Sequence, residues 1–377
     1  MFTKKDIYNK KILLALDLNE KPSRSSFRIQ SSLLSIQKIL EFKPKQLVLI
    51  SHYGRPEGID PDYSLEEHAK ILSGLIGQEV QLISGTEEEG YDDIGDGAGL
   101  YLLENLRFFN WQKLKITDKL TNNSDYLIYD AFGLVHRDKP YTTGLIQAFG
   151  KQRVFTGLLV DKEVEKLDEF LRNNAPKYLI LGGKKIGDKI PILDSLLPKV
   201  EKILIIGAVT NASYKALGIS IGASYINLEG IGNKEISLEQ IKKYYESKKI
   251  ILPEYVILDN KKQVQVDLKN NNTKIPEDRK IVDIDPASYD NIDLKKYAVF
   301  WNGNAGITED GFNSGTEEIA NKIIKSKYSI AAGGDTAKWL IQNLDLATKF
   351  DHISTGGGAA LEYIAKDGDL PVLKILE

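Results

Sequence analysis

Arginine is scarce in this chain of 377 residues and is concentrated in its first half. Of the 50 lysine and arginine residues, arginine occupies only positions 24, 28, 55, 107, 137, 153, 172 and 279. A guanidinium presents a planar fork of N–H donors that matches the oxygens of a phosphate or carboxylate. Arginine in a lysine-rich sequence therefore indicates positions that bind an anion, with a chance distribution of surface charge as the alternative.

Several of these arginines and two of the four histidines follow apolar runs that we expect to be strands. The set comprises Arg28, His52, Arg55, Arg107, His136 and Arg137. Asp17 and Asn19 come at the end of the first such run. Ligands of open parallel sheets bind at the carboxyl ends of the strands, so these groups would gather at one edge. Positive charges collected there repel one another unless an anion lies among them, and the pattern predicts an anionic-substrate pocket.

The second half carries glycine-rich turns at the same topological position. The three turns are Gly182-Gly183-Lys184-Lys185, Gly333-Gly334-Asp335-Thr336 and Thr355-Gly356-Gly357-Gly358. Glycines let backbone amides approach phosphate oxygens, lysines neutralise those oxygens, and a carboxylate can hold Mg²⁺. Glycines at such turns also serve simple packing, so the prediction of a nucleotide triphosphate site rests on the three turns together.

Two common nucleotide motifs are absent or out of place. No G-x-x-x-x-G-K-[ST] occurs, which excludes a Walker-type P-loop enzyme. The GDGAG at 95–99 resembles a dinucleotide fingerprint, but it follows an acidic segment instead of a strand. We interpret that segment as a loop.

The elements that would position these groups are short, continuous apolar runs separated by amphipathic stretches. The runs lie at 12–18, 46–51, 101–106, 126–132, 178–182, 203–207, 250–252, 255–258, 297–301, 329–332 and 352–354. Continuous apolar runs are typical of strands buried on both faces, and their alternation with helices predicts a parallel α/β fold. We expect two doubly wound, Rossmann-like domains, joined by a helix at 161–173 and a hinge, with a β-rich insertion near 251–285.

Composition narrows the class of protein. The chain has no cysteine and a formal net charge of −3, which excludes thiol chemistry and cysteine zinc sites and argues against a nucleic-acid partner. The longest apolar run near the start, at 12–15, is too short for a membrane span or a signal sequence. We expect a soluble, cytoplasmic protein with no membrane partner.

Seven motifs, in order along nearly the whole chain, resemble the phosphoglycerate kinase family. They read SHYGRPEG, ENLRF, DAFGLVHR, LGGKKIGDKI, WNGNAGITEDGF, AAGGDT and STGGGAALE. The resemblance implies a monomeric, hinge-bending glycolytic kinase that moves a phosphoryl group reversibly between 1,3-bisphosphoglycerate and ADP. It also implies a phosphoglycerate-binding domain at 1–160 plus 359–377 and a nucleotide-binding domain at 161–358.

By this resemblance, the acceptor site would lie in the first domain. Its residues would be Asp17, Asn19, Arg28, His52, Arg55, Arg107, His136 and Arg137. Arg28 would also contact the transferred group and so be catalytic.

The nucleotide and Mg²⁺ would lie in the second domain, again by resemblance. Gly182, Gly183 and Gly207 would line the adenine slot, Glu309 would bind the ribose, and Asn302 would contact the nucleotide. Lys185 and Lys189 would stabilise the moving phosphoryl group and the phosphates. Asp335 would face Mg²⁺, Gly333, Gly334 and Thr336 would cradle phosphate, and Gly356, Gly357 and Gly358 would supply amides.

The chain departs from the family pattern at four places. Ala15 stands where the family has an arginine, and the proline pattern that follows is altered to Glu20-Lys21-Pro22. The glycine run after 203–206 is reduced to Gly207-Ala208, and Asn304 stands where the family has a proline. Two alternatives therefore stay open. One is a kinase of the same fold with a shifted acid acceptor, and the other is a nucleotide-binding protein without turnover.

Overall fold

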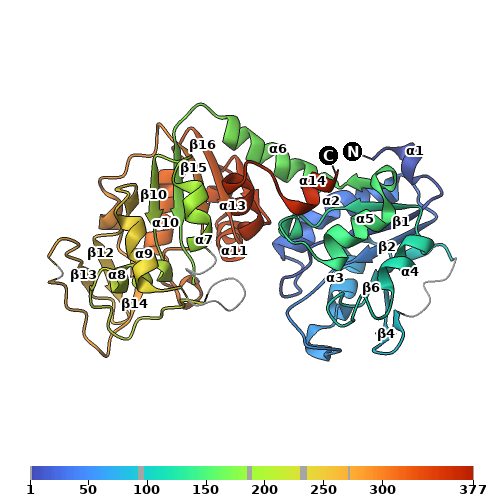
Figure 1. The fold of residues 1–377 in the computed structure, drawn as a ribbon, viewed down its shortest axis with the longest axis horizontal. Helices are drawn as coiled ribbons and strands as arrows, with labels where there is room; N and C mark the ends of the chain where they lie inside the picture. The colour runs from blue at the N-terminus through green and yellow to red at the C-terminus, as the bar shows by residue number, and fades with distance from the viewer. Residues whose placement is uncertain (1, 92–96, 185–188, 230–235, 271, 377) are drawn as a thin grey trace. The chain divides into compact units, whose positions relative to one another are not determined.

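The computed structural model describes residues 2–91, 97–184, 189–229, 236–270 and 272–376. The chain forms two compact units (Figure 1). The first comprises Met1–Leu167 together with Gly368–Glu377, and the second comprises Asp168–Asp367. The chain returns to the first unit at Gly368, later than the expected return at Ala359, because helix α13 (Gly357–Ala365) packs within the second unit.

The first unit is built on a six-stranded sheet whose strand order is β3-β6-β2-β1-β7-β8. All of its neighbouring strands run parallel. The strands are β1 (Lys11–Ala15), β2 (Gln46–Ile50), β3 (Gln81–Ile83), β6 (Gly99–Leu103), β7 (Tyr126–Tyr129) and β8 (Val154–Thr156). β4 (Gly85–Thr86) and β5 (Gly90–Tyr91) form a separate antiparallel pair.

Two helices cover the centre of this sheet with apolar side chains. Ile29 and Ile36 of α2 (Phe27–Glu41) and Leu72 of α3 (Glu66–Ile76) share one core with Leu14 and Leu49. Each of these side chains is fully buried. The remaining helices of the unit are α1 (Lys4–Ile7), α4 (Ile116–Asn123), α5 (Leu145–Phe149) and α14 (Pro371–Leu376).

The strand register aligns the places where the strands end. Ala15 of β1 pairs with Ile50 of β2 and with Tyr129 of β7. The residues that follow these three positions therefore begin at the same edge of the sheet. Asp17 and His52 are among them, so the register itself starts to assemble the site.

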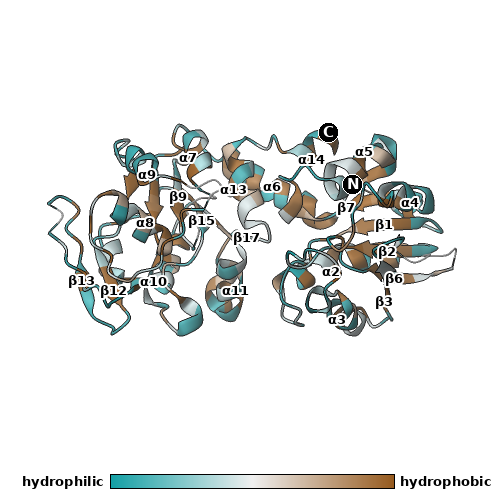
Figure 2. Cartoon of the chain, turned by 60° about the horizontal axis from the view of Figure 1, so that its bottom comes forward, coloured by the Kyte–Doolittle hydropathy of each residue, from teal (hydrophilic) through white to brown (hydrophobic). Residues whose placement is uncertain are grey.

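The second unit repeats the plan with a six-stranded sheet of order β11-β10-β9-β15-β16-β17. All neighbours again run parallel. The strands are β9 (Lys177–Leu181), β10 (Lys202–Ile205), β11 (Ile250–Ile251), β15 (Ala298–Asn302), β16 (Tyr328–Ala332) and β17 (His352–Ser354). Figure 2 shows β9 and β15 as largely brown, apolar segments.

The ends of β9, β15, β16 and β17 are also in register. Asn302 pairs with Leu181 and with Ala332, and Ala332 pairs with Ser354. The glycine-rich turns that follow these strands therefore start at one edge. The main helices of the unit are α7 (Ile190–Leu196), α8 (Ala208–Ala216), α9 (Leu238–Tyr245), α10 (Ser314–Ile323), α11 (Gly334–Gln342) and α12 (Leu344–Ala347).

The expected α/β class with two parallel sheets is confirmed, and each expected apolar run contains a strand. The region near 251–285 holds a three-stranded antiparallel sheet of β12 (Tyr255–Leu258), β13 (Gln263–Gln265) and β14 (Ile281–Ile284). Helix α6 (Leu158–Arg172) starts earlier than expected and carries residues of both units. Within the described ranges, no helix is long and apolar enough to cross a bilayer.

Candidate functional site

A buried ion pair lies at the carboxyl edge of the first sheet. Asp17 follows β1 and is only 5% exposed, and Arg28 in the first turn of α2 donates from Nη1 to its Oδ2 at 2.5 Å. Burial alone would raise the pKa of Asp17, but the charge of Arg28, its hydrogen bond and a hydrogen bond from the backbone N–H of Asn19 lower this pKa below its ordinary value. Asp17 is therefore a carboxylate among cations.

His52 lies within the same cluster and is kept neutral. Its side chain is 1% exposed. Burial lowers the pKa of His52 to about 3, with Arg107, Arg28 and Arg137 adding to the effect and Asp17 opposing it. Arg28, Arg107 and Arg137 are thus the guanidinium groups whose charges act on the imidazole. The structure thus brings together five of the expected residues of the first half.

A buried amide positions the Arg107 backbone beside this cluster. Asn105 is fully buried, and its Oδ1 accepts hydrogen bonds from the backbone N–H of Arg107 at 3.1 Å and of Tyr53 at 3.2 Å. The Arg107 guanidinium itself donates to the Gly54 carbonyl. Asn19 contributes from the first loop, since its Oδ1 accepts from the Gly54 N–H at 2.9 Å. Asn105 was not among the predicted site residues, although it lies within the ENLRF motif.

The remaining predicted residues of the first unit differ in exposure. His136 and Arg137 follow the short 3-10 turn Phe132–Leu134 and are half-buried. The Nε of Arg137 is buried and has no hydrogen-bond partner among the described residues, so this donor is available to an anion. Arg55 is exposed beside Gly54.

Glycine backbones meet closely at the edge of the second sheet. A Cβ added to Gly182 would lie 2.7 Å from the Gly303 carbonyl oxygen, and one added to Gly207 would lie 2.5 Å from that of Asn304. Gly207 and Gly303 also have φ values of +65° and +104°, which favour glycine. The loops after β9, β10 and β15 therefore pack backbone against backbone, which only glycine permits.

A cavity of about 570 Å³ opens at these loops. Its lining includes Gly183, Gly207, Asn211, Tyr225 and Asp335. Lys184 and Glu309 also line it and form an ion pair, with the Lys184 Nζ 2.7 Å from the Glu309 Oε1. Their hydrogen bond raises the pKa of Lys184 and lowers that of Glu309. Glu309, the predicted ribose ligand, thus has Lys184 as its partner in this structure.

The turn after β16 divides its predicted residues between surface and interior. Asp335 is exposed in the first turn of α11 and lines a second, open cavity as well as the first. Thr336 is fully buried, and its Oγ1 accepts a hydrogen bond from the Gly303 N–H at 2.9 Å. Gly334 has no atom within 4 Å of an added Cβ, so it faces open space.

The side chain of Asn302 lies between two of the glycine turns. Its Nδ2 would be 3.3 Å from a Cβ added to Gly333 and 3.0 Å from one added to Gly357. Gly358 faces open space at the start of α13, near the predicted amide donor Gly356. Lys185 lies outside the described residues. Lys189 directly precedes α7, and its Nζ would be 3.8 Å from a Cβ on Gly183.

Comparison with known proteins identifies the family. The sequence model described as "Phosphoglycerate kinase" matches residues 2–367. The chain is 33% identical over 393 residues to the phosphoglycerate kinase of Borrelia turicatae, covering 99% of this chain and 97% of the relative. The chain belongs to the phosphoglycerate kinase family. It is a phosphotransferase that moves a phosphoryl group reversibly between 1,3-bisphosphoglycerate with ADP and 3-phosphoglycerate with ATP, a step of glycolysis.

Further relatives agree in sequence and in fold. The phosphoglycerate kinase of Dictyoglomus turgidum is 33% identical over 392 residues, covering 99% of this chain and 96% of the relative. The solved structure from Pyrococcus horikoshii matches with a TM-score of 0.79 at 28% identity, covering 100% of this chain and 98% of that chain. The solved structure from Coxiella burnetii matches with a TM-score of 0.73 at 29% identity, covering 98% of this chain and 97% of that chain.

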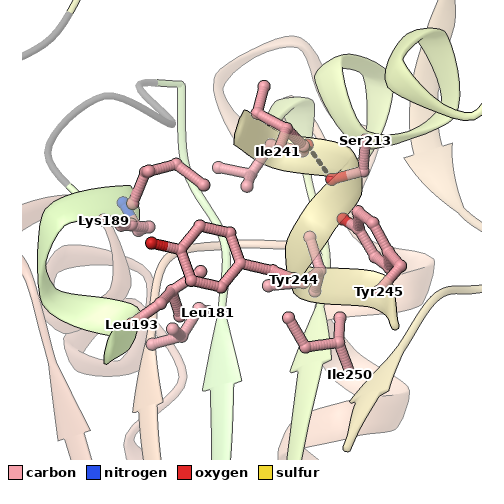
Figure 3. Close-up of a pocket in the computed structure, with 11 residues that line it drawn as sticks. Leu181, Lys189, Leu193, Ser213, Ile241, Tyr244, Tyr245 and Ile250 are labelled. Atoms are coloured by element: carbon pink, nitrogen blue, oxygen red, sulfur yellow. Dashed lines mark hydrogen bonds between the residues drawn. The ribbon is translucent and has the colours of Figure 1, made fainter. Parts of the chain in front are cut away.

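A further hollow beside Lys189 is too small for a ligand. It measures about 10 Å³ and is lined mainly by apolar side chains of β9, α7, α8 and α9. Figure 3 shows Tyr244 and Tyr245 filling it from α9, and the Ser213 hydroxyl donates to the Val209 carbonyl at 2.9 Å. A space of this size holds one water at most, so the hollow is a packing feature of the kinase.

The buried, neutral His52 predicts a pH dependence of stability. The unfolded chain binds a proton at His52 as the pH falls through 6.5, whereas the folded chain does so only near 3. The contribution of His52 to the free energy of unfolding is therefore fully present above pH 6.5 and decreases as the pH falls toward 3. We expect the free energy of unfolding, measured by urea titration between pH 7 and 4, to fall more steeply for the wild type than for His52→Gln. The difference in slope should be at most about 1.4 kcal/mol per pH unit. Equal slopes would contradict the assignment.

A second prediction concerns the space beside the Asp17–Arg28 pair. A Cβ added to Gly133 would lie 2.0 Å from the Asp17 Oδ2, so Gly133→Ala must displace the ion pair. We expect the Kd for 3-phosphoglycerate to rise about tenfold, equivalent to ~1.4 kcal/mol, with MgADP affinity within about twofold of wild type. Isothermal titration calorimetry measures both. Gly144→Ala is the matched control, because its Cβ would meet no atom closer than 3.6 Å.

Proposed function

We propose that the first unit binds the phosphoglycerate substrate and that the second binds the magnesium nucleotide. The observation that carries the first assignment is the cluster of Arg28, Arg107 and Arg137 around the neutral His52 and the Asp17 carboxylate. An acceptor with a carboxylate and a phosphate carries several negative charges. It would neutralise the three guanidiniums and use the unpartnered Nε of Arg137.

Within this proposal, Asp17 and Asn19 select and orient the substrate. The Asp17 carboxylate fixes the Arg28 guanidinium and is itself an acceptor for a substrate hydroxyl. Asn19 holds the loop at Gly54, next to the exposed Arg55. His136 contributes to the basic patch. Arg28 is 20% exposed, so part of its guanidinium remains accessible to the group in transfer.

The glycine loops of the second unit support the nucleotide assignment. Gly183 and Gly207 line the cavity that would take the base, and Gly182 packs against the Gly303 carbonyl beside them. Glu309 would exchange Lys184 for the ribose hydroxyls, and Asn302 lies beside the phosphate turns. Gly333 and Gly334, with the buried Thr336 beneath them, would hold phosphate through backbone amides. Gly357 and Gly358 would do the same at the first turn of α13.

The donor set in the second unit fits Mg²⁺ bound together with a nucleotide. Mg²⁺ commonly binds through one or two carboxylates plus substrate phosphates and waters. Asp335 is an exposed carboxylate of this kind, and no group of three or more His, Cys, Asp or Glu able to hold a metal alone occurs in the described part of the chain. Asp335 would hold the ion, which would supply charge neutralisation to the phosphates.

The residues of this chain would accelerate transfer through alignment and charge. Phosphoryl transfer needs little covalent assistance, because its barrier falls when fixed positive charges meet the equatorial oxygens. Arg28 would supply such a charge, and Lys185 and Lys189 would supply others. We further propose that the enzyme acts as a monomer in the cytoplasm on small-molecule substrates.

A coupled assay with two Arg28 variants tests the acceptor assignment. 3-Phosphoglycerate, MgATP, glyceraldehyde-3-phosphate dehydrogenase and NADH should give NADH loss with the wild type. We expect Arg28→Ala to lower kcat about 10²–10³-fold, the usual cost of removing one donor to the transition state. Arg28→Lys keeps the charge beside Asp17 and should retain more activity.

The matching control for Arg28 is nucleotide affinity. The Kd for MgADP should stay within about twofold in both variants, and an equal loss in kcat and nucleotide affinity would refute the role of Arg28. Wild-type turnover of another acid with none of 3-phosphoglycerate would indicate a shifted acceptor, which the replacement of the family's arginine by Ala15 would explain. MgADP binding without any turnover would indicate a non-catalytic protein.

The magnesium assignment has its own test at Asp335. We expect Asp335→Asn to raise the Mg²⁺ concentration needed for half-maximal rate at least tenfold, because a neutral amide is a poorer Mg²⁺ ligand than a carboxylate. The affinity for magnesium-free ADP should change little. Glu317→Gln, which removes another carboxylate bordering the open cavity, is the control. Equal shifts in the two variants would show a general charge effect.

A further inference from the structure

Tyr225 presents an aromatic ring at the rim of the nucleotide cavity. Its side chain is 54% exposed although tyrosine is largely apolar, and it lines the cavity together with Lys184 and Glu309. Large exposed aromatic side chains leave apolar surface in water and are common where a ligand covers them. An exposed aromatic ring at the rim of a cavity is therefore a candidate ligand contact.

Two hydrogen bonds hold Tyr225, one at its backbone and one at its ring hydroxyl. Asn211 of α8 is 2% exposed, and its Nδ2 donates to the Tyr225 carbonyl at 3.0 Å. Asn227 donates from Nδ2 to the Tyr225 hydroxyl at 3.1 Å. Backbone and ring tip are therefore both bonded, and ordering this side chain costs less when a ligand binds.

The neighbouring groups match the parts of a nucleotide. Tyr225 and Lys184 line the same cavity, and Lys184 pairs with Glu309, the proposed ribose ligand. Gly183 and Gly207 give the same cavity stretches of backbone without side chains. A base bound in this cavity with its ribose at Glu309 would share the space with the bare backbone of Gly183 and Gly207 and with the Tyr225 ring.

We propose that Tyr225 supplies a stacking face for the nucleobase. This inference rests on the proposed nucleotide site in the second unit. Stacking uses the π-face that every base has, so it does not depend on the hydrogen-bonding pattern of the base edge. Tyr225 therefore contributes similarly to adenine and guanine nucleotides and contributes nothing to the binding of phosphate alone.

The experiment compares four chains with three probes. Isothermal titration calorimetry of the full chain gives the Kd for MgADP, MgGDP and magnesium tripolyphosphate, which has no base. The chains are the wild type, Tyr225→Leu, Tyr225→Phe and Tyr8→Leu, the last a control at a 59% exposed tyrosine of the first unit.

We expect Tyr225→Leu to weaken MgADP and MgGDP about tenfold each, within the usual range for loss of one stacked aromatic. Tyr225→Phe keeps the ring and should stay within about threefold, and Tyr8→Leu should match the wild type. Tripolyphosphate affinity should be the same in all four chains, as should the KM for 3-phosphoglycerate.

Each of three results would overturn the inference. The first is that Tyr225→Leu binds MgADP as tightly as the wild type, the second is that tripolyphosphate affinity falls with that of MgADP, and the third is that Tyr225→Phe loses as much MgADP affinity as Tyr225→Leu. The second result would show a collapsed cavity, and the third a role for the hydroxyl. If the wild type itself fails to bind MgADP, the proposed nucleotide site is wrong, and this outcome is distinct from the other three.

Discussion

The buried Asp17 carboxylate is the charge on which the basic cluster of the first unit depends. Three guanidiniums near one imidazole repel one another, and the attraction of Asp17 for Arg28 offsets part of that repulsion. Removing one partner of a buried ion pair typically costs about 3–5 kcal/mol, because the other charge remains buried without compensation. Asp17 thus allows the fold to hold a cationic pocket before any substrate arrives, and the same attraction fixes Arg28 on α2.

The two units would bind their proposed anionic ligands by different physical means. The first uses side-chain charge, held by buried polar groups such as Asn105 that fix the loops. The second uses backbone, since Gly182, Gly207 and Gly303 bring carbonyls and amides closer than any side chain would permit. The difference suits the proposed ligands, because a nucleotide would bring its own magnesium ion to neutralise charge whereas a phosphoglycerate has no such ion.

The departures from the family pattern in the second unit are accommodated by polar contacts. Asn304 donates from Nδ2 to the Thr308 hydroxyl at 3.0 Å, and its carbonyl packs against Gly207. The shortened glycine run leaves Gly207 with positive φ immediately before α8, and that helix carries Asn211. Asn211 in turn holds Tyr225 at the cavity. The altered positions Gly207 and Asn304 are therefore connected, through Asn211, to Tyr225 at the proposed base position.

The sequence by itself determined the fold class and the place of most candidate residues. Continuous apolar runs specify strands buried on both faces, and parallel strands bring their carboxyl ends, here followed by Asp17, His52 and the glycine turns, to one edge. No strand was expected at β3 or β8, because three mostly partly exposed residues leave too weak a pattern. β13 and β14 lie within the β-rich insertion expected near 251–285, although neither was singled out as a strand. β14 is fully buried but has only four residues.

Tertiary structure alone decided which polar groups meet. Asn105 and Tyr53 are 52 residues apart in the sequence, and Lys184 and Glu309 are 125 residues apart, so no local sequence pattern predicts either contact. The same holds for the hydrogen bond from the Gly303 N–H to the buried Thr336 hydroxyl and for the bond from Asn211 to the Tyr225 carbonyl. Local sequence encodes burial and periodicity, whereas the partner of a hydrogen bond or ion pair depends on which loops the folded sheet places side by side.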